Sequence, residues 1–287
     1  MPLIDFILNI AGLLLWLTWL SVQFDPLTKT SAASLVGTLK KAGASGPKRW
    51  KFLAGLSALL LLRAVIYWEI GAAVNWTPRL DLEFIDLSFR SDYYGHMLLF
   101  SLLSFGFTLG IFYLSLLLLS MVNAGVPDAD PLQRLVRLYF ARVEGWPAAL
   151  KLMLPFLMGG LLWLALHPLL ARLAIVPETK SSGQLFEQAV ILGLGTYLAW
   201  KYLIVAILVM HLLHSYVYLG RHPVWSFVDV TARNLLSPLR WAPLRLGRVD
   251  FLPLAAIALV FLVTEPLSRL PAIEFPPHQP LSRFLPF

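Results

Sequence analysis

Two histidines are spaced so that they could act together. His211 and His214 lie three residues apart in an apolar stretch, so a helix would bring both imidazoles to one face. Such a pair binds a transition metal or a haem iron when a third ligand completes the site. The chain has no cysteine, and His167 lies elsewhere, so the ligand set is incomplete. We therefore expect hydrogen bonds between helices at these histidines, and no metal or cofactor.

Two more charged residues interrupt apolar stretches and are candidate functional residues, because charge is costly inside a bilayer. We expect Arg63 to pair with Glu69 or with a neighbouring helix, or to extend its guanidinium toward the headgroups. Lys201 stands between Trp200 and Tyr202. Aromatic neighbours of this kind are typical of a membrane interface, so the apolar span would begin at that point.

No catalytic motif accompanies these residues. The sequence contains no GxSxG element, no Walker loop, no HExxH element and no acidic pair of recognisable spacing. We therefore expect a protein that is not an enzyme.

The elements that carry these residues are apolar stretches of membrane-spanning length, since a bilayer core needs about 20 apolar residues in a helix. Six such stretches occupy residues 3–22, 52–74, 97–122, 152–175, 188–218 and 251–268. The chain is 58% hydrophobic and only 14% charged, so lipid must cover part of it. We predict an all-α membrane protein with about six transmembrane helices in hairpins. The first apolar stretch carries Asp5 and has no basic residues at its start. We therefore expect it to remain in the protein as a membrane span rather than to be cleaved as a signal peptide.

Basic residues are concentrated in three of the connecting segments. Fifteen of the 23 lysines and arginines lie within residues 23–51, 123–151 and 219–250. The positive-inside rule then places these segments in the cytoplasm and both termini in the periplasm of a bacterial inner membrane. The formal charge of +7 is explained by this topology and by anionic lipid, rather than by nucleic acid.

The third basic segment predicts a short amphipathic helix in the cytoplasmic interface. Pro223 suits the first helical turn, and Pro238 ends the helix. One face is apolar: Val224, Phe227, Val228, Thr231 and Leu235. Other residues would face water or headgroups: Ser226, Asp229, Arg233 and Arg240. Trp225 and Trp241 suit that depth. Residues 131–147 repeat the pattern.

Residues 200–268 resemble the YggT family, whose repeat is a membrane hairpin. The matching positions are His222, Pro223, Pro238, Gly247, Asp250 and Pro253. The family has Asn in place of His222 and Thr-Glu-Pro in place of residues 232–234, and a weaker copy spans about 111–175. The resemblance implies links to cell division, osmotic-shock tolerance or cytochrome maturation, and no shared catalytic residue. We expect Asp250 to cap the last helix.

These patterns divide the chain into an N-terminal membrane hairpin (1–95), a degenerate YggT-like hairpin (96–176), a second YggT-like hairpin (177–270) and a Pro-rich tail (271–287). Glycines at 106 and 110, and at 159 and 160, would allow close helix contacts.

Our leading hypothesis is a non-enzymatic scaffold or assembly factor. Its lipid- and partner-binding surface would comprise Trp225, Phe227, Arg233, Arg240, Trp241, Arg245 and Arg248. The partners would be anionic headgroups and a cell-division or cytochrome-maturation protein, with a homo-oligomer left open. A transporter or ion conduit that uses Arg63, Lys201 and the histidines is the alternative, and a haem-maturation factor is the third hypothesis. A shared water-filled cavity around these side chains would favour transport.

Overall fold

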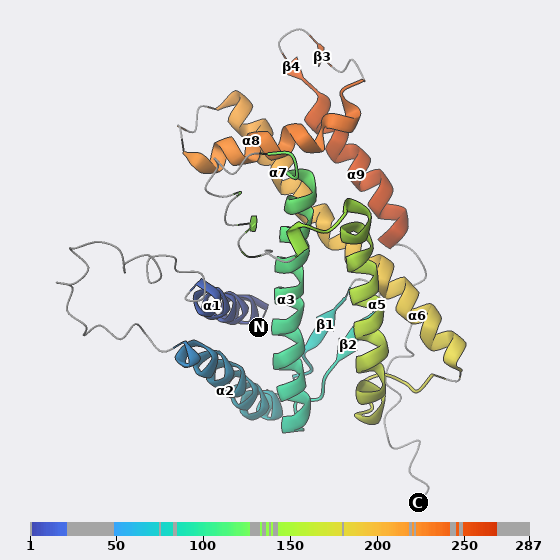
Figure 1. Cartoon of the computed structure of the whole chain (residues 1–287). Coiled ribbons are helices and arrows are strands. Elements are labelled where there is room, and N and C mark those ends of the chain that lie inside the picture. Colours follow the sequence, from blue (N-terminus) through green and yellow to red (C-terminus); the bar gives the residue numbers. More distant parts are fainter. Residues whose placement is uncertain are drawn as a thin grey trace, which may run out of the picture. The chain divides into compact units, whose positions relative to one another are not determined.

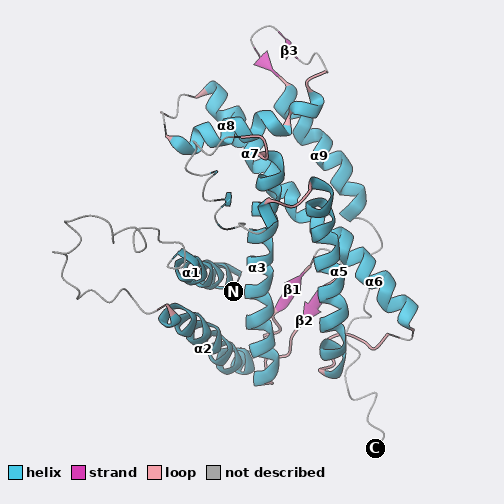
Figure 2. Cartoon of the chain, in the orientation of Figure 1, coloured by secondary structure: helices cyan, strands magenta, loops and turns pink. Residues whose placement is uncertain are grey.

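The computed structural model describes residues 2–21, 49–74, 76–82, 85–126, 143–179, 181–217, 222–241 and 249–268, with Gln133, Val136, Arg137, Tyr139, Gly220, Arg245 and Leu246. The Gly/Ser/Lys-rich segment 37–47 and the Pro-rich tail lie outside these residues. The chain forms two compact units: unit 1 is 1–78 with 88–110, and unit 2 is 79–87 with 111–287. Helices dominate both units (Figures 1 and 2).

Unit 1 contains α1 (Pro2–Ser21), α2 (Trp50–Val74) and the part of α3 (Tyr94–Val122) that ends at Gly110. Their many leucines and alanines favour helix, and a helix satisfies every backbone group within its own segment. A core of Leu56, Leu60 and Phe105, against which Leu15 and Trp16 of α1 pack, holds the three helices together. A Cβ atom on Gly12 would lie 2.9 Å from the Phe105 ring, so this glycine permits the close approach of α1 and α3.

Unit 2 contains the rest of α3, then α5 (Ala148–Arg172), α6 (Ser182–Gly195), η4 (Thr196–Leu198) and α7 (Ala199–Tyr216). The stretch predicted at 188–218 starts earlier because the Ser181 hydroxyl caps the helix, accepting from the Gln184 N–H at 3.2 Å. Taken together, α6 to α7 span 35 residues. A helix of that length extends about 52 Å, so it must tilt or project beyond a hydrocarbon core of about 30 Å.

The end of unit 2 is built around α8 (Pro223–Leu235), which lies across the last turns of α7 (Figure 1). A 3-10 turn, η5 (Ser237–Leu239), and an antiparallel hairpin, β3 (Arg245–Leu246) with β4 (Val249–Asp250), lead into α9 (Leu252–Ser268). The predicted helix start at Pro223 and the stop before Pro238 are confirmed. The other predicted amphipathic segment, 131–147, is described only in part, and there Val136 is buried.

All six predicted apolar stretches are helical, which agrees with an all-α membrane protein. By length and composition, five helices can cross a membrane when α6 to α7 is taken as one. The sixth, α9, has 17 residues, so the count of six crossings stays a prediction. Two short strands, β1 (Arg79–Asp81) and β2 (Asp86–Ser88), were not predicted from the sequence.

The exposed helix faces have the chemistry expected of a lipid contact. Leu62, Leu161 and Leu262 are 58%, 61% and 70% exposed. Hydroxyls on such faces bond to their own helix, as Ser115 does to the Ile111 carbonyl at 2.8 Å and Thr264 to the Val260 carbonyl at 2.8 Å. This arrangement leaves no hydroxyl proton of these two residues pointing unpaired into an apolar surrounding.

Candidate functional site

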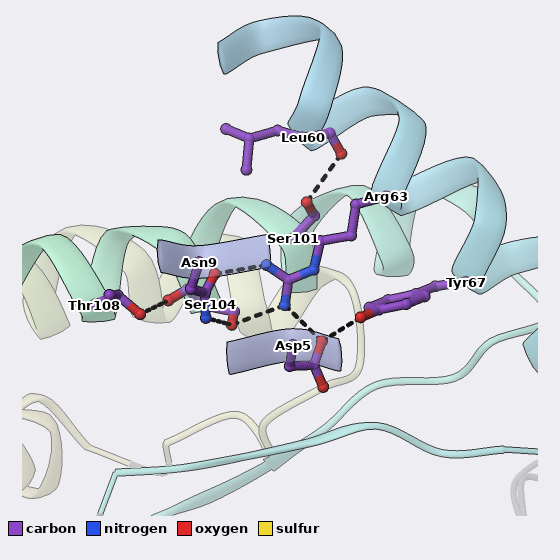
Figure 3. A network of polar contacts seen from close by, with 8 residues as sticks. All are labelled: Asp5, Asn9, Leu60, Arg63, Tyr67, Ser101, Ser104 and Thr108. Atoms are coloured by element: carbon purple, nitrogen blue, oxygen red, sulfur yellow. Dashed lines mark hydrogen bonds and ion pairs between the residues drawn. The ribbon is translucent and has the colours of Figure 1, made fainter. Parts of the chain in front are cut away.

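Arg63 is the centre of a buried polar network in unit 1 (Figure 3), and only 2% of its surface is exposed. One terminal nitrogen donates to the Asn9 side-chain oxygen at 2.7 Å. The other donates to the Asp5 carboxylate at 2.8 Å and to the Ser104 hydroxyl at 2.9 Å. Asp5 and Asn9 belong to α1 and Ser104 to α3. The Arg63 guanidinium therefore links α2 to α1 and α3.

Aromatic rings close this network. The Arg63 guanidinium carbon lies 5.4 Å from the centroid of the Tyr67 ring and 5.4 Å from that of Phe100, close enough for a cation–π attraction. The Tyr67 hydroxyl donates to the same Asp5 oxygen as Arg63. Of our expected partners, the neighbouring helix is the one that the structure shows, while Glu69 is exposed. Burial and hydrogen bonds from both terminal nitrogens make Arg63 a group that links helices.

Lys201 belongs to unit 2, where aromatic rings surround its ammonium group. The Nζ atom lies 5.2 Å from the centroid of the Tyr202 ring and 5.7 Å from that of Phe261 on α9. The adjacent Trp200 points elsewhere, since its Nε1–H donates to the Leu114 carbonyl of α3 at 2.9 Å. Lys201 and Arg63 are thus each engaged within their own unit.

The two histidines of α7 share one carboxylate on α8. Nδ1 of His211 lies 2.8 Å from one oxygen of Asp229, and Nδ1 of His214 lies 3.0 Å from the other. Because an ionised carboxylate only accepts, each Nδ1 carries the proton. The expectation of hydrogen bonds between helices is met at both histidines. Asp229 was expected to face water or headgroups and does so only in part: its side chain is 23% exposed, and both oxygens bond to the imidazoles where α8 crosses α7.

The apolar face of α8 packs against protein. Val228 and Ala232 lie in a cluster with Ile207 and Leu208 of α7 and Ala256 of α9. Phe227, which we had included in the binding surface, is half-buried against the cluster of α3 and Trp200. The helix thereby becomes a fixed part of unit 2.

The opposite side of α8 and the turn after it carry exposed cationic and aromatic groups. Arg233 and Arg240 are exposed, and one Arg240 nitrogen donates to the Arg233 carbonyl at 3.2 Å. Trp241 is 83% exposed. Trp225 stacks on the His214 ring, with centroids 5.4 Å apart and planes at 6°.

A pocket of about 540 Å³ opens where α7 turns into α8. Its polar lining comes from His214, His222, Ser226, Asp229 and Arg233, with Trp225 as an apolar wall. His222 is the N-cap of α8, and its Nδ1 accepts from the Val224 N–H at 3.3 Å. Pro223 follows as the first helical residue. Gly220, on the approach to the pocket, has φ +84°, a conformation that favours glycine.

Several predicted site residues lie in or next to segments that the structure does not describe. Gly247, Arg248 and the side chains of Arg245 and Asp250 lie outside the described part of the chain. Since α9 begins at Leu252, Asp250 precedes the helix by two residues, and its capping role stays a prediction. Pro253 is buried in the first turn of α9, and Pro238 lies in η5.

Buried polar contacts that the sequence analysis missed hold α8 to α3. Asn123 of the α3 end donates to the Thr231 hydroxyl at 2.9 Å and accepts from the Asn234 amide at 3.0 Å. Polar residues near a basic loop resemble a solvated surface, so no sequence signal distinguishes these from exposed ones.

Lys151 is likewise buried, although we had counted it among the basic loop residues. Its Nζ donates to the Ser120 hydroxyl at 3.0 Å and to the Glu144 carbonyl at 2.8 Å. The Ser120 hydroxyl in turn donates to the Glu144 carboxylate at 2.6 Å. These hydrogen bonds link the end of α3 to α5 and to the segment before it, so the pair contributes to packing within unit 2.

Among the described residues, no group of three or more His, Asp or Glu side chains is placed to hold a metal ion. Comparison with protein-family models, with curated proteins and with solved structures finds no match to this chain. The resemblance to the YggT family therefore stays a prediction, and function has to be argued from the geometry.

Proposed function

We propose that this chain is a non-enzymatic membrane scaffold or assembly factor of the YggT type. It would hold α8 at the headgroup level on the cytoplasmic side of a bacterial inner membrane, with both termini in the periplasm. The proposal rests on the two different faces of α8. The apolar face packs against α7 and α9, whereas Arg233, Arg240 and Trp241 are exposed at and after the end of the helix.

A fixed helix supports recruitment for a physical reason. A helix that packs on its own unit loses little further conformational freedom when a partner binds, so the cost of ordering is small. Exposed arginines beside a tryptophan also suit anionic headgroups and the charged rim of a protein partner.

The transport alternative receives less support from the intramembrane charges. Arg63 has its terminal nitrogens paired within unit 1, and Lys201 lies against two rings in unit 2. The histidines both donate to Asp229. Side chains with such local partners would need to break these contacts before they could coordinate a passing ion.

The test replaces Arg233, Arg240, Arg245 and Arg248 together by glutamine. We expect the variant to insert normally, to lose enrichment of anionic lipid in purified particles, and to retain fewer cross-linked proteins from native membranes. The matched control is Arg90→Gln with Arg172→Gln, two exposed arginines remote in sequence from α8. Equal lipid enrichment and equal cross-linking in the two variants would refute the proposal.

Topology is checked separately. Reporter fusions at Gly43, Asp128 and Leu246 should all report from the cytosol. A periplasmic signal from any of the three would remove the shared basic face on which the proposal depends.

A further inference from the structure

We propose that the pocket between the end of α7 and the start of α8 binds a phosphate group, such as that of an anionic phospholipid headgroup. This inference deepens the proposed function, and it rests on that function for the placement of α8 at the headgroup level. It adds a defined binding site to what would otherwise be a diffuse basic surface.

Three residues with hydrogen-bond donors line the pocket. Nδ1 of His222 accepts a backbone N–H, so the neutral ring carries its proton on Nε2 and offers a donor there. The Ser226 hydroxyl is a second donor. The Arg233 guanidinium, which forms no side-chain hydrogen bond or ion pair among the described residues, is a third, and it can bind a phosphate through two nitrogens.

The one carboxylate that the described residues contribute to the lining is hydrogen-bonded on both oxygens. These oxygens, of Asp229, accept from imidazole N–H groups at 2.8 Å and 3.0 Å. Asp229 keeps its negative charge, and the Arg233 guanidinium in the same lining offsets it. The two hydrogen bonds orient His214 and the Trp225 ring stacked on it. The indole then forms a flat wall suited to the glycerol part of a headgroup.

The same geometry disfavours a cation. A metal needs several lone pairs, and of the two lining histidines only His214 keeps one, on Nε2, because His222 uses its Nδ1 lone pair on the Val224 N–H. The Arg233 guanidinium would repel a metal ion at close range. The volume of about 540 Å³ lies within the usual range for small-molecule sites, and it exceeds the space that one ion needs.

The experiment uses the full chain in neutral maltoside micelles, with binding counted by native mass spectrometry. The probes are phosphatidylglycerol, diacylglycerol, glycerol 3-phosphate and inorganic phosphate. We expect one saturable phosphatidylglycerol and no saturable diacylglycerol. Displacement by glycerol 3-phosphate or inorganic phosphate would show that the phosphate alone suffices, and absence of displacement would assign the site to the lipid. Either result supports the site, provided that the saturable binding depends on Arg233.

Three variants locate the binding. Arg233→Gln should weaken phosphatidylglycerol binding about tenfold, since it removes a charge-assisted contact. Ser226→Ala should cause a smaller loss. Arg172→Gln, at an exposed arginine of α5 that neither lines the pocket nor belongs to the proposed binding surface, should change the affinity less than about twofold. Absence of saturable binding, or equal losses in Arg233→Gln and Arg172→Gln, would overturn the inference.

The two proposals fail in different ways. If the four-arginine variant loses recruitment but no single Arg233-dependent lipid is found, the scaffold function stands without this pocket. If recruitment is unchanged while one Arg233-dependent lipid still binds, the pocket stands and the scaffold function is lost.

Discussion

The Arg63 guanidinium of α2 lies 2.8 Å from the Asp5 carboxylate of α1, and the two residues are 58 positions apart in the chain. The arginine side chain is 1% exposed and the aspartate side chain 19%. An ion pair removed from water in this way depends on further hydrogen bonds, because each of them offsets part of the cost of desolvation. Asn9, Ser104 and Tyr67 supply those additional bonds. Nε of Arg63 is buried without a partner among the described residues, so the terminal nitrogens make all the hydrogen bonds of the guanidinium there.

Removing Asp5 alone should be strongly destabilising. Asp5→Leu leaves the guanidinium buried without its counter-charge, which costs about 3–5 kcal/mol. The double variant Asp5→Leu with Arg63→Met should recover part of this loss, because both charges are gone. Equilibrium unfolding in micelles measures both effects.

The exposed ion pair of Arg90 and Asp92 is the matched control. Its atoms are 3.2 Å apart, with side chains 47% and 53% exposed. Asp92→Asn should cost less than about 1 kcal/mol, because water and salt screen such pairs. Equal costs for Asp5→Leu and Asp92→Asn would mean that the buried network does not hold α1.

Asp229 should control the docking of α8 on α7. Asp229→Ala removes the shared acceptor of His211 and His214 and should cost about 1–3 kcal/mol. Hydrogen exchange should then accelerate along α8, since the crossing loses its polar contact while the apolar cluster remains. The measurement is exchange mass spectrometry of the α8 peptides.

Ser226→Ala is the control for this change, because Ser226 is exposed on the same helix. It should leave exchange in α8 as it is in the parent. If Asp229→Ala also leaves exchange unaltered, the histidine contacts do not hold α8.

Two glycines should respond with opposite sign to the same substitution. A Cβ atom on Gly193 would lie 2.7 Å from the Phe156 carbonyl of α5, so Gly193→Ala should destabilise the α5–α6 contact by about 1–3 kcal/mol. In the part of the chain that the structure describes, no atom lies within 4 Å of a Cβ atom on Gly106, where alanine should stabilise the helix by about 0.5–1 kcal/mol. Thermal unfolding of the two variants measures the difference.

The close helix contacts expected at two pairs of glycines are present at one pair. Gly159 and Gly160 meet α6, whereas among the described residues no atom lies within 4 Å of a Cβ atom on Gly106 or Gly110. A destabilising Gly106→Ala would show that another molecule packs on that face. The sequence alone could not distinguish the two pairs of glycines. Glycine spacing shows where a helix can approach closely, but it does not show which helix packs there.

The sequence by itself determined where the helices lie and where α8 starts and stops. Those features depend on local properties: an apolar length that matches the bilayer, a proline in a first turn, and a proline that ends a helix. Each can be recognised from residues within a few turns of one another. The apolar stretches at 3–22 and 52–74, for example, agree with α1 and α2 within two residues.

Only the tertiary structure decided which polar groups meet. Asp5 reaches Arg63 across 58 residues, and Asn123 reaches Thr231 across 108. Asp229 was expected to face outward from its position on an amphipathic helix, and its contacts with His211 and His214 arise because that helix crosses α7. The physical reason is the same in each case: a buried charge or amide takes whatever partner helix packing brings within about 3 Å, and that packing depends on the whole fold.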